Sequence, residues 1–264
     1  MTIAKRGPLA RAAPDVVAGL VVLAAPATAT WALLDLPATY LLQALALYGV
    51  VGGLVLAGRP PALPGPGLGG ANRVTLARST LVVSLTPLVI YPSVHNHVGH
   101  WWIILIATLA LVLDGVDGWL ARKTGGSSAF GARFDMELDA FLILVLAVLV
   151  WLAAKAGPGV ILIGAMRYGF VAASWVWPAL QGELPPSLRR KTVCVVQGIV
   201  LLVCLGPIIP RWFSYPIAWA ALILLAYSFA ADVLWLVREN DRAQAGGSVA
   251  ATPTAEAASD SYPE

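Results

Sequence analysis

Residues 114–139 read DGVDGWLARKTGGSSAFGARFDMELD and contain two closely spaced pairs of aspartates. Asp114 and Asp117 are three positions apart, and Asp135 and Asp139 are four apart, so each pair shares one face of a helix. Apolar runs of near-spanning length flank this stretch, and a carboxylate near hydrocarbon is costly unless it is paired or binds a cation. Four facing carboxylates therefore predict a site for a hard divalent ion, Mg²⁺ or Mn²⁺, which prefers oxygen ligands.

The composition predicts a membrane protein. Hydrophobic residues make up 59% of the 264 residues, charged residues make up 12%, and the mean hydropathy is +0.79. Soluble domains have roughly a quarter of their residues charged. Apolar runs of near-spanning length occur at residues 16–34, 38–57, 76–94, 98–118, 136–154, 158–178, 192–209 and 213–237. We therefore expect an all-α, polytopic integral membrane helix bundle with eight transmembrane helices.

The aspartates belong to a longer pattern, Asp-x2-Asp-Gly-x2-Ala-Arg-x8-Gly-x3-Asp-x3-Asp. Its positions are filled by Asp114, Asp117, Gly118, Ala121, Arg122, Gly131, Asp135 and Asp139. This pattern resembles the signature of the CDP-alcohol phosphotransferase (CDP-alcohol phosphatidyltransferase) family. Two other segments are similar to family members: ANRVTLAR, which carries Asn72, Thr75 and Arg78, and the segment Arg190-Lys191-Thr192 followed by Gln197. The resemblance covers roughly residues 70–238.

The resemblance implies a reaction and a site. A substituted phosphate, expected to be a phosphatidyl group, would pass from a CDP-diacylglycerol-type lipid donor to an alcohol, with release of CMP. Two Mg²⁺ or Mn²⁺ ions about 4 Å apart would bind the four aspartates. Asp139 would also be the catalytic base that takes the proton of the acceptor hydroxyl. The residues expected to contact the donor nucleotide are Asn72, Thr75, Arg78, Gly118, Ala121, Arg122 and Gly131.

The chain is expected to divide into four parts. Residues 1–58 form an N-terminal arm and two extra transmembrane helices, and the Pro- and Gly-rich residues 59–70 form a linker. The six-helix catalytic core spans residues 71–238, and the small, polar residues 239–264 form a disordered cytoplasmic tail. Gly49 and Gly53 form a weak G-x-x-x-G on the second helix, so the extra pair could support a homodimer.

The basic residues predict the orientation. With both termini cytoplasmic, all of the seventeen Lys and Arg residues fall on the cytoplasmic side except Lys155, Arg211 and the intramembrane Arg167. The aspartates then lie at the cytoplasmic face. The net charge of +3 is expected to reflect this topology and attraction to anionic lipid headgroups, with no nucleic-acid partner.

A second basic group could select the acceptor. Arg133, Arg167, Arg190 and Lys191 could bind a phosphate on the acceptor, which favours a phosphorylated polyol such as glycerol 3-phosphate or an inositol phosphate. A free alcohol such as inositol, serine or choline is the alternative. Among the other polar residues, Glu137 is expected to face away from the ions, Asp232 to pair with a cation, and the histidines of SVHNHVGH (93–100) to lie in a solvated outer loop.

Two readings compete with a metal-dependent transferase. The aspartates could pair with Arg122, Lys123 and Arg133 in a purely structural network. A cation transporter could also place carboxylates within membrane helices. The transporter hypothesis explains neither the small residues at fixed steps nor Arg122 within the pattern, and the sequence shows no inverted repeat with matched broken helices.

Overall fold

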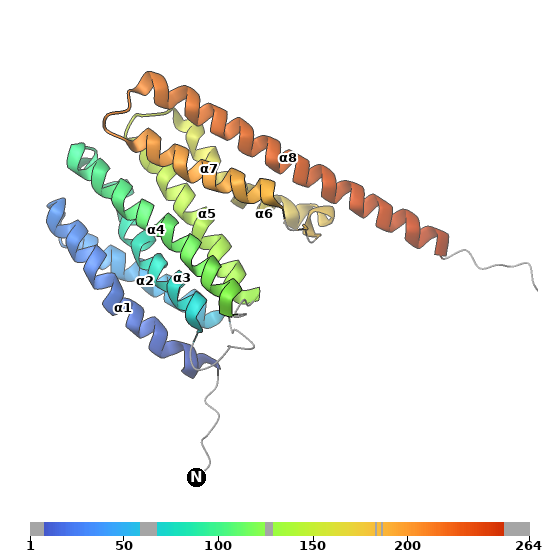
Figure 1. Cartoon of the computed structure of the whole chain (residues 1–264), viewed down its shortest axis with the longest axis horizontal. Coiled ribbons are helices and arrows are strands. Elements are labelled where there is room, and N and C mark those ends of the chain that lie inside the picture. Colours follow the sequence, from blue (N-terminus) through green and yellow to red (C-terminus); the bar gives the residue numbers. More distant parts are fainter. Residues whose placement is uncertain (1–7, 59–67, 125–128, 183, 186, 251–264) are drawn as a thin grey trace, which may run out of the picture.

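The chain forms a bundle of long helices (Figure 1). The computed structural model describes residues 8–58, 68–124, 129–182, 184–185 and 187–250, and no strand occurs among them. The α-helices in this part are α1 (Pro8–Leu33), α2 (Thr39–Ala57), α3 (Gly70–Leu85), α4 (His97–Thr124), α5 (Ala129–Leu152), α6 (Ile161–Val176), α7 (Leu188–Leu205) and α8 (Arg211–Ala250). Short 3₁₀ turns are η1 (Thr86–Ile90), η2 (Pro92–Val94), η3 (Pro158–Val160) and η4 (Pro178–Gln181). The all-α bundle expected from the composition is confirmed.

The helices are those of a multi-pass membrane protein. Six segments of the described chain are long and apolar enough to cross a membrane: Ala12–Leu33, Thr39–Ala57, Gly70–Ile90, His97–Val116, Pro158–Val176 and Arg211–Arg242. The helices α5 and α7 are not among these six, and both carry several charged residues in their first turns. Many large apolar side chains are exposed on the bundle, as expected for a surface that faces lipid.

Local sequence explains where α3 ends and where α4 begins. Helix α3 gives way to the 3₁₀ turn η1 at Thr86-Pro87, where the proline lacks the N–H that an α-helix needs. The fourth helix begins after Asn96, whose side-chain oxygen accepts a hydrogen bond from the Gly99 N–H at 2.8 Å. This is the contact that an N-cap makes with the free amides of a first turn.

The N-terminal helix pair packs directly on α3. One buried cluster joins Leu23 and Ala27 of α1, Val55 of α2, and Leu76 and Val83 of α3. In addition, the Tyr40 hydroxyl donates to the backbone oxygen of Ser84 at 2.7 Å. By contrast, Gly49 and Gly53 have no atom within 4 Å of where a Cβ would stand, so their face of α2 is open. That open face leaves the homodimer as a proposal.

The main core lies among α3, α4, α5, α7 and α8. Helix α5 is its centre, since Leu142, Leu146 and Leu149 recur at helical spacing and all three are fully buried. Gly164 of α6 approaches α5 so closely that a Cβ there would stand 2.7 Å from the Leu144 nitrogen. Figure 1 shows α6, α7 and α8 grouped on one side of α5 and the first four helices on the other.

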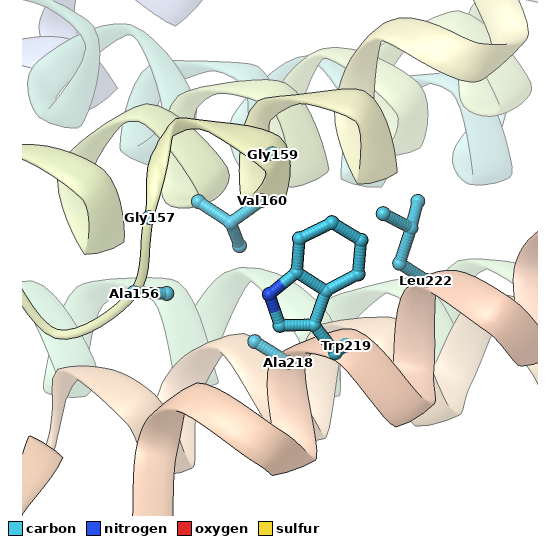
Figure 2. A pocket seen from close by; sticks show the side chains of 7 residues that line it. All are labelled: Ala156, Gly157, Gly159, Val160, Ala218, Trp219 and Leu222. Atoms are coloured by element: carbon cyan, nitrogen blue, oxygen red, sulfur yellow. The ribbon is translucent and has the colours of Figure 1, made fainter. Parts of the chain in front are cut away.

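The ends of the helices opposite the aspartates are closed by side chains. Lys155, after α5, donates to the backbone oxygens of Gly206 at 2.9 Å and Ile209 at 2.6 Å, which caps the C-terminal end of α7. Nearby, the indole of Trp219 fills a small pocket between α8 and the α5–α6 connection (Figure 2). A Cβ at Gly159 would stand 3.2 Å from that ring, so the glycine admits the indole.

Two expectations about polar segments need correction. His100 is not in a solvated loop: it lies in the first turns of α4 and is buried, because η1 and η2 fold the α3–α4 connection back over the bundle. The segment after residue 238 continues as helix α8 to Ala250. There, Glu239 and Arg242 form an ion pair one turn apart at 3.5 Å, which supports a solvated helix. The linker residues 59–67 lie outside the described part.

Candidate active site

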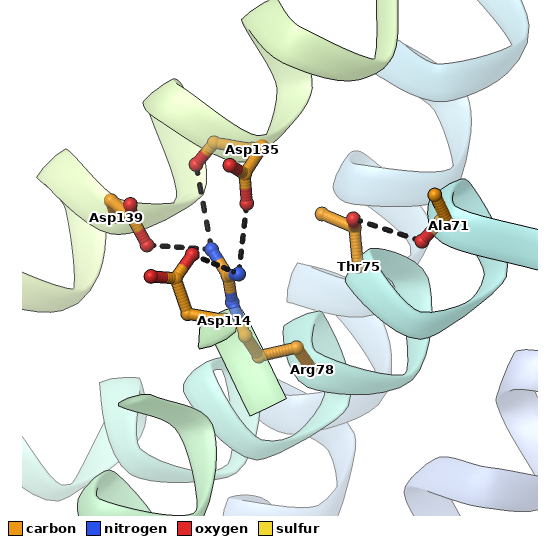
Figure 3. A network of polar contacts seen from close by, with 6 residues as sticks. All are labelled: Ala71, Thr75, Arg78, Asp114, Asp135 and Asp139. Atoms are coloured by element: carbon orange, nitrogen blue, oxygen red, sulfur yellow. Dashed lines mark hydrogen bonds and ion pairs between the residues drawn. The ribbon is translucent and has the colours of Figure 1, made fainter. Parts of the chain in front are cut away.

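Three helices bring the aspartates together around one arginine. Arg78 reaches from α3, Asp114 lies near the C-terminal end of α4, and Asp135 and Asp139 lie one turn apart near the start of α5. The Arg78 Nη1 donates to Asp114 Oδ1 at 2.7 Å and contacts Asp135 Oδ1 at 2.8 Å, while Nη2 donates to Asp139 Oδ1 at 2.6 Å (Figure 3). The guanidinium therefore contacts all three carboxylates.

Burial differs sharply between the arginine and its partners. The Arg78 side chain is 0% exposed, whereas those of Asp114, Asp135 and Asp139 are 32%, 35% and 24% exposed. The cation therefore lies behind the carboxylates, which keep one side open to solvent or to a ligand. Among the side chains that the structure describes here, one positive charge faces three negative charges, and such an excess of negative charge favours further cations.

The chemistry of this cluster suits a hard metal ion. One carboxylate oxygen from each of Asp114, Asp135 and Asp139 lies within 4.8 Å of the others. Carboxylate oxygens are the ligands that Mg²⁺ and Mn²⁺ prefer. Asp117 lies on the same helix one turn after Asp114, but its side chain is outside the described part. The described aspartates therefore fit the divalent ion that the sequence predicts.

The first turns of α3 hold two further predicted residues, and both are buried. Asn72 is 5% exposed and donates from Nδ2 to the backbone oxygen of Leu68 at 2.8 Å. Thr75 is 3% exposed, and its hydroxyl donates to the backbone oxygen of Ala71 at 3.2 Å (Figure 3). Both side chains lie on the helix that carries Arg78, at steps of three residues, so one face of α3 leads toward the carboxylates.

Comparison with known proteins places this arrangement in a family. A family model described as CDP-alcohol phosphatidyltransferase matches residues 69–231. The chain belongs to the CDP-alcohol phosphatidyltransferase family. The matched segment begins immediately before α3 and ends within α8, so α1 and α2 lie outside it. Membership in this family overturns the transporter hypothesis, because the family is one of transferases.

Curated relatives share only parts of the chain. The chain is 34% identical over 91 residues to ethanolaminephosphotransferase 1 of Mus musculus, and this match covers 31% of the chain and 23% of the relative. It is 29% identical over 137 residues to CDP-diacylglycerol--glycerol-3-phosphate 3-phosphatidyltransferase of Pseudomonas fluorescens, covering 47% of the chain and 63% of the relative. The chain therefore spans about a quarter to under two thirds of these proteins. No solved structure matches.

The other residues expected at the site occupy α4 and α5. Gly131 is buried and Gly118 is half-buried. Because neither glycine has a side chain, both leave room for another group to approach the backbone. For Ala121 and Arg122, the structure describes the helical backbone of α4 but not the side chains. Lys123, one of the cations of the structural alternative, stands over the Trp119 ring at 4.7 Å from its centre.

The basic residues expected at the acceptor are split between two places. Arg167 of α6 pairs with Glu137 of α5, which confirms that Glu137 turns away from the three aspartates toward α6. Arg189 and Arg190 both pair with Asp232 of α8, which confirms Asp232 as a pairing residue. Arg190 also donates to the backbone oxygen of Pro185, whereas Arg133 and Lys191 are exposed. Arg167 lies on α6, and Arg190 and Lys191 lie in the first turn of α7; both of these helices pack against α5.

Sequence reasoning missed two features of the site. Arg78 was expected to contact the donor, which stays a prediction, but its role as the buried counter-charge of the carboxylates was not foreseen. The signal was available, since Arg78 is a lone cation in the apolar segment TLARSTLVV. The second feature is Cys194 of α7, which lies within electrostatic range of Asp114, Asp135, Asp139 and Arg167. It places the first turns of α7 beside the site.

Proposed function

We propose that this protein is a membrane enzyme of phospholipid biosynthesis that transfers a phosphatidyl group from a CDP-diacylglycerol-type donor to an alcohol and releases CMP. The observation that carries this proposal is the convergence of Asp114, Asp135 and Asp139 around the buried Arg78. It occurs within a chain of this family whose helices are long and apolar enough to span a membrane. We place this site and both termini at the cytoplasmic face, from the distribution of Lys and Arg.

The proposed residue roles combine the geometry of the described aspartates with what the family resemblance implies. Asp114, Asp135 and Asp139, with Asp117, would hold divalent ions, which when bound neutralise the diphosphate of the donor. Asp139 takes the proton from the acceptor hydroxyl as its oxygen forms a bond to the phosphorus that carries the lipid. The bond from that phosphorus to the bridging oxygen breaks, and this oxygen leaves with CMP. Arg78 holds three carboxylates at set positions throughout.

The acceptor that we propose is a phosphorylated polyol such as glycerol 3-phosphate or an inositol phosphate. Arg167 supports it, because this cation on α6 pairs with Glu137 of α5, a residue two positions from both Asp135 and Asp139 in the sequence, and Glu137 is about half exposed. An incoming phosphate could therefore replace the carboxylate of Glu137. The name of the bacterial relative specifies glycerol 3-phosphate, which agrees. The name of the mouse relative specifies ethanolamine, which keeps a free-alcohol acceptor as the second candidate.

An acceptor screen tests the proposal. Purified protein in lipid nanodiscs would receive CDP-diacylglycerol, Mg²⁺ and one acceptor at a time, with CMP release as the measurement. We expect release with a phosphorylated polyol, and less than a tenth of it from Asp114→Asn or Asp135→Asn, because an amide cannot replace an anionic ligand. Asp241→Asn, on the exposed end of α8, is the matched control and should keep full activity. Absence of acceptor-dependent CMP release with every acceptor would refute the proposal.

A further inference from the structure

A carboxylate outside the family match holds the start of the helix that carries Arg78. Asp15 of α1 accepts a hydrogen bond from the backbone N–H of Leu68 at 2.6 Å through Oδ2. Its other oxygen, Oδ1, accepts from Arg73 Nε at 2.9 Å. The Asp15 side chain is 13% exposed, whereas that of Arg73 is 53% exposed. The contact to Leu68 is therefore the better shielded of the two.

Leu68 connects this carboxylate to Asn72. Leu68 is 1% exposed, and its N–H bonds to Asp15 while its carbonyl oxygen accepts from Asn72 Nδ2 at 2.8 Å. The next residue, Gly69, has φ +85°, a conformation that a residue with a Cβ rarely adopts. Both polar backbone groups of Leu68 are thus engaged where the chain bends into α3. A shift of Leu68 would therefore displace the Asn72 carboxamide, which donates to the Leu68 oxygen.

Asp15 stands on a rigid support. The Tyr48 hydroxyl of α2 donates to the backbone oxygen of Val16, the neighbour of Asp15, at 2.8 Å. The two helices approach closely through glycines: a Cβ at Gly52 would stand 2.7 Å from Val16 Cγ1, and one at Gly19 would overlap the Tyr48 ring. Close backbone approach leaves little freedom for α1 to slide along α2. The position of Asp15 is therefore fixed by both N-terminal helices.

We propose that Asp15 is a positioning residue for donor binding, which acts through Leu68 on Asn72 and the first turns of α3. This inference rests on the proposed function, in which Asn72 contacts the CDP moiety of the donor. The two N-terminal helices are then a structural part of the nucleotide site. Asn72 lies six residues before Arg78, about 9 Å along the helix axis, so the same hold also sets how far Arg78 extends among the carboxylates.

Equilibrium binding of CDP to the full-length protein in nanodiscs with Mg²⁺ tests this role, with thermal unfolding measured on each variant. We expect Asp15→Ala to weaken CDP binding by about 5- to 30-fold, less than the roughly 10- to 150-fold of a lost direct hydrogen bond to a charged group, because Asp15 acts on the donor only through Leu68 and Asn72. Asp15→Asn, whose amide oxygen can still accept from Leu68, should bind within about threefold of the wild type. Arg73→Ala should change binding less than about twofold, because its ion pair is half exposed.

A second variant separates position from charge. Asp15→Glu keeps the charge and can still pair with Arg73, but it moves the carboxylate by one methylene and should weaken CDP binding more than Asp15→Asn does. The reverse order would overturn the role, because it would mean that the ion pair matters and the hydrogen bond to Leu68 does not. Binding by folded Asp15→Ala within twofold of the wild type would overturn it as well. A wild-type protein that does not bind CDP would instead refute the proposed function.

The kinetic readout distinguishes positioning from loss of structure. The KM for CDP-diacylglycerol should rise in Asp15→Ala in step with the loss of CDP affinity, while the KM for the acceptor stays within about twofold, since Arg167, the residue proposed to bind the acceptor, lies on α6. Asp35→Asn, in the exposed turn at the other end of α1, is the matched control and should leave both constants unchanged. A parallel rise of both KM values in Asp15→Ala would show a general loss of structure and contradict the proposal.

Discussion

At the scale of single residues, the site depends on how one arginine and three aspartates are arranged. Three carboxylates that would repel one another share the guanidinium of Arg78, which is fully buried behind them. Planar donor geometry lets one arginine contact several carboxylates at once, which a lysine cannot do in the same way. The exposed sides of the aspartates remain open for divalent ions. Arg78 therefore holds the three carboxylates from their buried side.

Removal of this counter-charge should couple stability to metal. We expect Arg78→Gln to lower the melting temperature in EDTA, and added Mg²⁺ to restore part of the loss, because the ion then offsets the repulsion. Breaking a buried ion pair costs about 3–5 kcal/mol, and less is expected here because the carboxylates are partly exposed. Intrinsic tryptophan fluorescence during heating measures the effect. Arg73→Gln, whose ion pair is half exposed, is the control, and an equal loss in both variants would contradict the assignment.

Arg167 should discriminate between acceptors. If it binds a phosphate on the acceptor, Arg167→Ala should raise the acceptor KM about 10- to 150-fold, equivalent to roughly 1.5–3 kcal/mol for a charge-assisted hydrogen bond. The KM for CDP-diacylglycerol should hardly change. Glu137→Gln removes the partner but keeps the cation, so its acceptor KM should stay equal or fall. If Arg167→Ala changes neither KM, the arginine is structural and a free alcohol becomes the better acceptor.

At the scale of elements, the site depends on how closely α5 and α6 pack. Helix α5 carries Asp135, Asp139 and Glu137, and α6 carries Arg167. Their approach is closest at Gly164, where the backbone of Leu144 occupies the space that a Cβ would need. Small residues at such crossings allow close helix contact in membrane proteins. This single glycine sets the spacing between the aspartates and the arginine proposed to bind the acceptor.

Substitution at this crossing should therefore affect both stability and acceptor binding. Gly164→Ala would force α6 away from α5, at a cost of about 1–3 kcal/mol for overpacking. We expect a lower melting temperature and a raised acceptor KM. Gly169→Ala lies on the same helix with nothing within 4 Å of its Cβ, so it should be neutral or slightly stabilising. Equal behaviour of the two variants in thermal unfolding would contradict the role of the crossing.

At the scale of the whole molecule, the candidate active site and the side chains that close the bundle lie at opposite ends of the helices. The aspartates lie at one end of the helices, and the Lys155 cap and the Trp219 pocket lie at the other (Figures 1–3). The N-terminal pair, α1 and α2, adds to the core on the side of α3. Such a division allows a water-soluble product to leave at one face while the opposite end remains packed.

The activity of the whole enzyme should require a divalent ion. CMP release is expected with Mg²⁺ or Mn²⁺ and should vanish in EDTA, whereas Ca²⁺ should support it poorly because its longer, looser coordination misplaces the reacting oxygens. Titration of each ion into chelator-treated protein measures this dependence. Full turnover in excess chelator would contradict metal binding by the aspartates.

Reporter fusions test the orientation. With both termini cytoplasmic, a green fluorescent protein fused after residue 264 should fluoresce, and alkaline phosphatase fused at the same point should be inactive. Phosphatase fused in the α5–α6 connection, near Lys155, should be active and serves as the matched control. The opposite pattern would place the aspartates on the outer face and reverse the proposed topology.

The sequence by itself determines the family, the membrane bundle and the approximate place of each helix, although α3 begins at Gly70 and not at residue 76. Apolar runs must be helical in lipid to satisfy their backbone hydrogen bonds, and the aspartate pattern needs only spacing along the chain. At the C-terminal end of α8 the expectation was wrong. The helix continues to Ala250, because a polar segment can be helical without an apolar face.

Only the tertiary structure decides which charges meet. Arg78 is separated from Asp114 and Asp139 by 36 and 61 positions, and Asp15 from Leu68 by 53, so no local spacing relates them. Among the cations whose side chains the structure describes, Arg78 contacts the aspartates, whereas Lys123 and Arg133 are exposed. Each of these pairs joins different helices, and its geometry depends on how the helices cross. Packing of side chains sets those crossings, and for that reason they could not be derived from periodicity along the chain.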